Sequence, residues 1–283
     1  MTSPSLYVVS TPIGNLGDIT RRAVDTLRAA DVVLAEDTRR TGMLLRHLEI
    51  QTRLVSAHEH NEASRATLVV EMLREGKNVA LVSDAGTPLL SDPGARIVRE
   101  VVAAGFPVVP IPGASALLSA LVASGIEAER FTFFGFPPRK GPERAEMLEE
   151  IASSPRASVL YESPNRLGRL MADLAEAAGG ERRVAVAREL TKLHEEFFRG
   201  TLAEAAARYA DAEVLGEIVV VVAGRTADAA AEGEVDALAA DAVAKALLSQ
   251  GQSPSAVAKE LRRRLGISRN DAYRIAQDAA EES

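Results

Sequence analysis

Short apolar runs alternate with segments of helical spacing along most of the chain, up to about residue 225. Val79–Val82 is a continuous apolar run of strand length, whereas the apolar residues between Thr20 and Ala30 recur every three or four positions, as on one face of a helix. Strands that alternate with helices predict an α/β domain with a mostly parallel sheet. The predicted elements also include strands at Leu6–Ser10, Val32–Ala35 and Val108–Ile111 and helices at Thr41–Leu48, Asn61–Glu75, Ala95–Ala104 and Ser115–Ala123.

A second α/β unit follows, and its first strand, Phe131–Phe136, is rich in aromatic residues. Beyond it the chain becomes small and polar, which predicts a linker, and then reads as helix only. We therefore expect four parts: an α/β domain over residues 1–125, a second α/β domain over 126–225, a linker over 226–234 and a helical tail over 235–283.

The helical tail concentrates positive charge within an acidic protein. The whole chain has a net charge of −7, yet seven basic and two acidic residues lie between Lys245 and Arg274. Its helices start near Ala237, Pro254 and Ser268, and the last two, around a short glycine turn, form a helix-turn-helix pattern. We favour contact with nucleic acid over a solvated helical cap or a dimerisation element, because the charge is local and follows a linker.

Composition excludes several classes of protein. The 283 residues are 47% hydrophobic and 26% charged, as in a globular protein, and no apolar stretch approaches the length of a membrane span. There is no cysteine, which excludes disulfides, thiolate metal sites and cysteine nucleophiles. With four histidines only, we expect no metal site. No secretory signal is present at the N-terminus, so we expect a cytoplasmic protein without a membrane partner.

Four loops of the first domain gather the residues that suit a binding site. Each follows a predicted strand, and they span residues 11–18, 36–40, 83–94 and 110–116. Ligands of open α/β sheets bind at the carboxyl ends of the strands, where such loops meet. None of the four matches the dinucleotide-binding or Walker A pattern. Four elaborate loops at one edge favour a ligand site over four ordinary turns.

The order of these motifs resembles the tetrapyrrole methylase superfamily. The motifs are STPIGNLGDIT at 10–20, AEDTR at 35–39, SDAGTPLLSDPG at 83–94 and PGASA at 112–116, then FFGFPPRK at 133–140, YESPNR at 161–166, RELTKLHEE at 188–196 and GEIVVV at 216–221. Within the superfamily the resemblance is to the enzymes that methylate a ribose 2′-hydroxyl in ribosomal RNA. It implies two α/β domains with S-adenosylmethionine (SAM) in the cleft between them, and a homodimer.

The resemblance also implies which residues hold SAM. The implied contacts come from the first loop, the loop after the fourth strand, a helix start with small residues, and a wall from the second domain. They are Pro12, Gly14, Asp84, Ala85, Gly86, Thr87, Ser115, Ala116, Tyr161, Leu190 and Thr191.

Methyl transfer to a ribose hydroxyl gains from a general base, because the hydroxyl is a poor nucleophile. Spacing selects none of the candidates, which are Glu36, Asp37, Glu62, Glu162, Glu189 and Lys192. Arginine forks fit phosphate oxygens, so basic residues of the loops and the tail are candidate RNA contacts, with surface ion pairing as the alternative. They are Arg39, Arg40, Arg139, Lys140, Arg166, Arg262 and Arg263.

We therefore expect a SAM-dependent enzyme that 2′-O-methylates a cytidine of small-subunit ribosomal RNA, either free or in the assembled subunit. One alternative is an enzyme of the same fold that methylates carbon atoms of a porphyrin or corrin. Another is a nucleic-acid-binding regulator without catalytic activity. The tail with its run of three arginines, 262–264, favours RNA.

Overall fold

The computed structural model describes residues 3–226, 240–265 and 269–281. The first domain is a five-stranded sheet in the order β3-β2-β4-β1-β5, and every pair in it is parallel. Its strands are β1 (Leu6–Val9), β2 (Val32–Ala35), β3 (Arg53–Ser56), β4 (Val79–Val82) and β5 (Val108–Ile111). β2 and β4 are buried along their whole length. Burial on both faces is the reason these two strands are continuous apolar runs.

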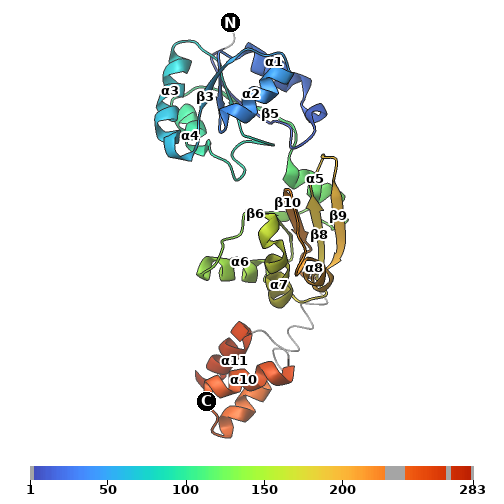
Figure 1. The fold of residues 1–283 in the computed structure, drawn as a ribbon. Coiled ribbons are helices and arrows are strands. Elements are labelled where there is room, and N and C mark those ends of the chain that lie inside the picture. Colours follow the sequence, from blue (N-terminus) through green and yellow to red (C-terminus); the bar gives the residue numbers. More distant parts are fainter. Residues whose placement is uncertain (1–2, 227–239, 266–268, 282–283) are drawn as a thin grey trace.

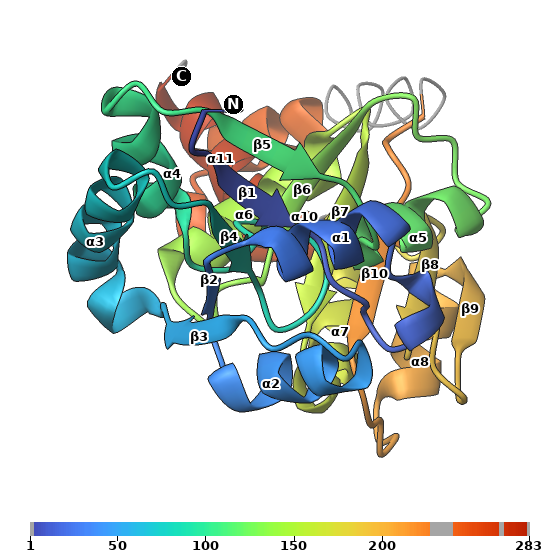
Figure 2. The ribbon, with the colours of Figure 1, turned by 90° about the horizontal axis from the view of Figure 1, so that it is seen from above.

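Helices cover both faces of this sheet. α1 (Arg21–Ala29) and α2 (Thr38–His47) share a core with one face, whereas α3 (Glu62–Arg74) and α4 (Ala95–Ala103) pack on the other. Figure 2 shows α3 and α4 side by side. The chain thus leaves the neighbouring strands β1 and β4 toward opposite faces. Such a reversal opens a crevice at the carboxyl ends of the two strands, which is where ligands of this architecture bind.

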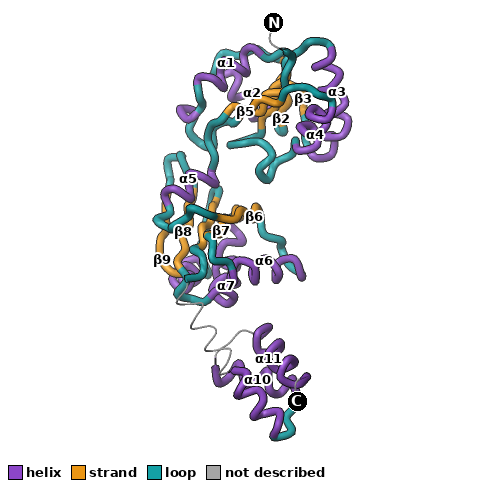
Figure 3. Tube along the Cα trace, turned by 180° about the vertical axis from the view of Figure 1, so that it is seen from behind, coloured by secondary structure: helices purple, strands orange, loops and turns teal. Residues whose placement is uncertain are grey.

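The second domain is a mixed sheet in the order β6-β7-β10-β8-β9, in which only β6 and β7 are parallel. Its strands are β6 (Phe131–Gly135), β7 (Ala157–Glu162), β8 (Arg183–Arg188), β9 (Glu196–Thr201) and β10 (Ile218–Val222). One face is covered by α6 (Pro142–Ser153), α7 (Leu167–Ala178) and α8 (Leu202–Tyr209). Figure 3 shows the strands of each domain flanked by helices.

The other face of the second sheet is covered by α5 (Ala116–Ala123). Leu117 and Leu121 of this helix share a core with Val159 and Val219. In Figure 1, α5 lies with the second domain, although it follows β5 of the first domain directly. A domain boundary at residue 125 remains a prediction, and the packing places α5 on the second sheet.

The tail folds around a core of its own. A helix at residues 240–249, α10 (Pro254–Leu265) and α11 (Arg269–Glu281) enclose residues such as Val257, Leu261 and Ala276. The predicted helix starts at Ala237 and Ser268 and residues 227–234 of the predicted linker lie outside the described residues.

The α/β class and the positions of most elements are confirmed, with one strand missed. β3 has only four residues, its apolar residues are half-buried, and it lies at the edge of the sheet, so its pattern is weak. Polar side chains cap the starts of three helices. Thr20 accepts a hydrogen bond from Ala23 at the start of α1, and Asp37 and Ser115 cap α2 and α5.

Candidate active site

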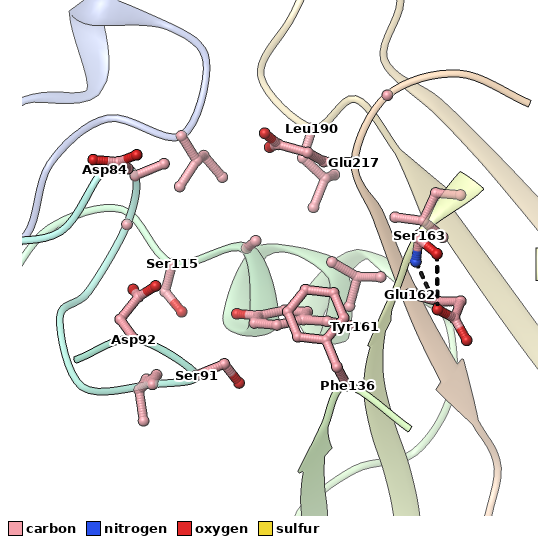
Figure 4. Close-up of a pocket in the computed structure, with 18 of the residues that line it drawn as sticks. Asp84, Ser91, Asp92, Ser115, Phe136, Tyr161, Glu162, Ser163, Leu190 and Glu217 are labelled. Atoms are coloured by element: carbon pink, nitrogen blue, oxygen red, sulfur yellow. Dashed lines mark hydrogen bonds between the residues drawn. The ribbon is translucent and has the colours of Figure 1, made fainter. Parts of the chain in front are cut away.

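A cavity of about 400 Å³ lies between the two domains. Figure 4 shows Asp84, Ser91 and Asp92 on the side of the first domain and Tyr161 and Leu190 on the opposite side. Eight of the eleven residues predicted to hold SAM line this cavity: Asp84, Ala85, Gly86, Thr87, Ser115, Ala116, Tyr161 and Leu190. The other three, Pro12, Gly14 and Thr191, adjoin the lining residues Ile13 and Leu190 in sequence and stay predictions.

The loops after β1, β4 and β5 are joined into one wall. The amide of Thr11 donates to the carbonyl of Gly86 (2.9 Å), and the amide of Gly86 donates back to Thr11 (3.1 Å). The Thr87 hydroxyl lies 3.0 Å from the Ser10 hydroxyl and 3.2 Å from the carbonyl of Ala114. These bonds make the first-domain side of the cavity a preformed surface.

Gly14 is the point at which the first loop touches the second domain. A Cβ atom on this residue would collide with Lys192 Cγ and would lie 3.0 Å from Thr191 Oγ1 and 3.2 Å from the carbonyl of Leu190. Its φ is not in the left-handed region, so glycine is needed here for space and not for conformation. The contact places the 190–192 turn against the first domain, next to the lining residues Ile13 and Leu190.

The 189–192 turn is held by a small ionic network. The Lys192 ammonium donates to Glu189 Oε1 (2.7 Å) and lies 3.3 Å from Glu217 Oε2. The hydrogen bond from Lys192 lowers the pKa of Glu189. Burial works to lower the pKa of Lys192, but the hydrogen bond and charge of Glu189 and the charge of Glu217 leave it raised. Both groups are therefore charged at neutral pH, which suits an ion pair better than proton transfer.

Carboxylates gather at the first-domain side of the cavity. Asp84 accepts a hydrogen bond from the amide of Asp37 (2.9 Å), and Arg40 lies 3.7 Å from its other oxygen. Burial, followed by the charge of Asp84, raises the pKa of Glu36. Burial, followed by the charge of Glu36, raises the pKa of Asp92 to about 6. Mutual repulsion of this kind favours a cationic ligand.

The carboxylates of two other candidate bases, Asp37 and Glu62, are bound by groups of the protein itself. Asp37 caps α2 and binds the Arg39 guanidinium (2.8 Å), which lowers its pKa to about 2. Glu62 accepts from the amides of Gly94 (3.1 Å) and Arg96 (2.7 Å) at the start of α4.

Glu162, whose backbone is at the end of β7, lines the cavity, but its buried side chain is engaged elsewhere. One oxygen binds Ser163 and Arg166, and the other, Oε2, is buried without a hydrogen-bond partner.

The candidate RNA contacts differ in how exposed they are and in which groups of the protein they already bind. Arg39 is 88% exposed, Arg139 and Lys140 are exposed in the loop after β6, and Arg40 lines the cavity. Arg166 is more tightly held, since it also donates to the carbonyl of Pro137 (2.6 Å).

In the tail, Arg262 is exposed, and Arg263 forms an ion pair with Glu260 (2.6 Å). The local positive charge is thus partly compensated within α10.

Asp92, Phe136 and Glu217 line the cavity but were not selected from the sequence. Each lies inside one of the quoted motifs, so the signal was present, yet nothing in the spacing showed which residues of a motif face the ligand. Phe136 packs near Tyr161, with ring centroids 5.5 Å apart, and extends the aromatic side of the cavity.

Neither metal sites nor membrane spans are found in the described parts of the chain. No group of three or more potential ligands there could hold a metal ion. No described helix combines the length and apolar character needed to cross a membrane.

Residues 5–206 match the family model described as Tetrapyrrole (Corrin/Porphyrin) Methylases, and the chain belongs to this family. The protein is accordingly a SAM-dependent methyltransferase. Solved structures of related fold include uroporphyrin-III-C-methyltransferase from Thermus thermophilus (TM-score 0.54, 22% identity, 77% of this chain and 93% of that one). The methyltransferase CobJ is another (TM-score 0.59, 22% identity, 78% and 95%). At this identity the likeness concerns the fold alone.

Much closer relatives carry the name ribosomal RNA small subunit methyltransferase I. The protein of that name from Synechocystis sp. is 43% identical and the alignment covers 95% of this chain and 96% of the relative. The one from Micromonospora olivasterospora is 45% identical (99% and 89%), and the one from Bacillus subtilis 43% (96% and 94%).

The cavity fits SAM in size and chemistry. A volume of about 400 Å³ is within the usual range for cofactor sites. SAM carries a sulfonium and an ammonium, and the carboxylates of Asp84 and Asp92 offer compensating charge. Its adenosine suits the side formed by Phe136, Tyr161 and Leu190, which is largely apolar. SAM supplies an activated methyl group when bound.

Proposed function

We propose that the protein transfers the methyl group of SAM to the ribose 2′-hydroxyl of a cytidine in small-subunit ribosomal RNA. One observation carries the proposal. Three relatives named for small-subunit ribosomal RNA align with 95–99% of this chain, so their alignments include the tail. The tetrapyrrole-type structures span only 77–78% of it. The segment beyond the two α/β domains is therefore matched in these three relatives.

The chain's contribution to such a reaction is mainly alignment, because the methyl group already has an excellent leaving group. Asp84 and the joined loops of the first domain hold the donor from one side, and Tyr161 and Leu190 hold it from the other. The N-terminal amides of α5, next to Ser115, favour a carboxylate group. The contact between Gly14 and the 190–192 turn brings the two sides together.

The RNA would approach from the side on which Arg39 and Arg40 lie near the cavity mouth. Arg139 and Lys140 on the loop after β6 and Arg262 on the tail are further exposed basic residues that RNA phosphates could bind. Arg166 and Arg263, which already bind carboxylates, would contribute less, since phosphate would have to replace those partners. Either free ribosomal RNA or the assembled small subunit fits this proposal.

We also propose that the protein acts in the cytoplasm, where bacterial ribosomal subunits are made, and that it forms a homodimer, as the family resemblance implies. Sedimentation equilibrium of the purified chain tests the second point. A mass of one chain at all concentrations would contradict it.

The decisive experiment is methyl transfer from radiolabelled SAM to small ribosomal subunits from cells that lack this enzyme. We expect label in the RNA, recovered after nuclease digestion as 2′-O-methylcytidine. Parallel reactions contain deproteinised ribosomal RNA and a porphyrinogen. Label in the porphyrinogen alone would support the carbon methyltransferase instead. Tight RNA binding without any label would support a regulator.

A further inference from the structure

The loop that joins β6 to α6 carries two exposed cations, Arg139 and Lys140. Among the described residues, no carboxylate forms an ion pair with either of them. The loop starts beside the cavity, because Phe136 lines the cavity and lies next to Tyr161, as Figure 4 shows. Four residues of extended chain span at most about 14 Å, so the backbone of Lys140 lies within that distance of Phe136.

The backbone of this loop has little conformational freedom. Pro137 and Pro138 fix two consecutive φ angles, and a proline also restricts the residue before it. Gly135 and Gly141, at the two ends of the loop, have φ angles of 63° and 94°. A Cβ on Gly135 would lie 3.0 Å from Ser91 Oγ, so the start of the loop lies against a residue that lines the cavity. The chain thus turns at each end of the loop, with a stiff segment between the turns.

Two arginines hold the carbonyl groups of the two prolines. Arg166 donates to the carbonyl of Pro137 (2.6 Å), and Arg144 donates to the carbonyl of Pro138 (3.0 Å). A hydrogen bond from a charged donor is about twice as strong as one between neutral groups. These two arginines, which we call the loop clamp, therefore fix the backbone immediately before Arg139.

The loop clamp is anchored to two elements of the second domain. Arg166 Nε lies 3.2 Å from Glu162 at the end of β7, whose side chain is fully buried. Arg144 donates twice to Asp173 of α7 (2.9 and 2.7 Å). The Arg144 side chain is only 7% exposed, so it has no route to an RNA phosphate. An arginine that holds a loop from inside the fold acts on a ligand only through that loop.

We propose that Arg144 and Arg166 are positioning residues, which hold Arg139 and Lys140 in place to bind an RNA phosphate beside the reacting ribose. This inference rests on the proposed function. Long basic side chains and loops lose conformational freedom when they bind, and a backbone that is already fixed lowers this cost. Arg166, a candidate RNA contact in the sequence, then acts through its neighbours and does not itself touch the RNA.

Arg144→Gln and Arg166→Gln each remove one half of the loop clamp. Methyl transfer to small-subunit RNA at saturating SAM should give a KM for RNA about 5- to 50-fold above the wild type, because the RNA must then order a looser loop. The kcat and the dissociation constant for SAM, measured by calorimetry, should change by less than about threefold, since neither arginine lines the cavity. Arg166→Lys keeps the charge and should recover part of the loss.

A double-mutant cycle separates positioning from direct contact. The second background is Arg139→Ala with Lys140→Ala, and the affinity for small-subunit RNA is measured by fluorescence anisotropy. The effects of residues that act through one another are not additive. In this background Arg166→Gln should therefore weaken RNA binding by less than about twofold. A direct phosphate contact would keep its full effect in both backgrounds.

Arg182→Gln is the matched control. Arg182 also donates to two backbone carbonyls, those of Ala223 (3.2 Å) and Ala152 (3.0 Å), and it does not line the cavity. This variant should lower the thermal stability, as Arg144→Gln does, and should leave the KM for RNA unchanged. Melting curves show which variants are folded, and Arg166→Gln completes the test if Arg144→Gln does not fold.

Three results would overturn the proposal. One is a KM for RNA within about twofold of the wild type in the folded clamp variants, and another is a full effect of Arg166→Gln in the double-alanine background. The third is an equal rise of KM in Arg182→Gln, which would make lost stability the cause. Failure of the proposed function is a different result, in which the wild-type protein places no label in ribosomal RNA.

Discussion

The contact between Gly14 and the 190–192 turn can be tested with one added methyl group. In Gly14→Ala the new Cβ would collide with Lys192 Cγ and would crowd Thr191 Oγ1 and the carbonyl of Leu190. Lys192 can move its flexible side chain, but the backbone carbonyl can retreat only if the two loops separate. Leu190 lines the cavity, so this separation displaces one of its walls.

The size of the effect follows from the crowding. Inserting a methyl group into a closely packed contact costs about 1–3 kcal/mol. If the cost arises on closing the cavity around its ligand, the affinity for SAM falls roughly 5- to 150-fold, since 1.4 kcal/mol is a factor of ten. Titration calorimetry with SAM measures this change in affinity. Thermal unfolding of the protein without SAM shows whether the added methyl group also lowers the stability of the fold.

Gly42→Ala is the matched control. Its Cβ would lie 3.5 Å from Leu54 Cδ1 and 3.6 Å from an Arg46 nitrogen, which are ordinary contacts within α2. Alanine is favoured over glycine inside a helix by up to about 1 kcal/mol, so this variant should be more stable and should bind SAM as the wild type does. Wild-type affinity and melting temperature in Gly14→Ala would refute the reasoning about the close contact.

Three other changes test separate parts of the molecule. Asp84→Ala should weaken SAM binding, because it removes a carboxylate that lines the cavity and accepts the hydrogen bond from the Asp37 amide. Titration calorimetry measures the affinity, and an unchanged value would show that Asp84 is not part of the SAM site. Arg144→Met removes the buried partner of an ion pair with the partly exposed Asp173 (2.7 Å); because Arg169 still lies 3.8 Å from that carboxylate, the free energy of unfolding should fall by about 1.5–3 kcal/mol in urea titrations, with SAM affinity retained. A loss below 1 kcal/mol would contradict this. Deleting residues 227–283 should leave SAM binding intact and weaken binding of small-subunit RNA at low salt, because the tail has its own core. Equal RNA affinity would make the tail's role structural.

Local patterns in the sequence were enough for the α/β class and most elements. β4 is apolar throughout because it is buried on both faces, and the polar caps at Thr20, Asp37 and Ser115 mark helix starts because they bind amides within their own first turn. Signals of this kind need only neighbours in sequence. The motifs around Asp84 also identified the edge of the sheet at which the cavity lies.

The partners of residues distant in sequence depended on the tertiary structure. Nothing near Gly14 indicates the backbone of Leu190, nothing in the α5 sequence indicates that it packs on the second sheet, and nothing in the 83–94 motif shows that Asp92 lines the cavity together with Asp84. Each of these facts follows from the order in which strands pair and from the faces on which helices cross. Strand order and helix packing bring together charges and surfaces that are far apart in sequence, which local sequence patterns do not show. They also raise the pKa of Asp92, through burial and the charge of Glu36.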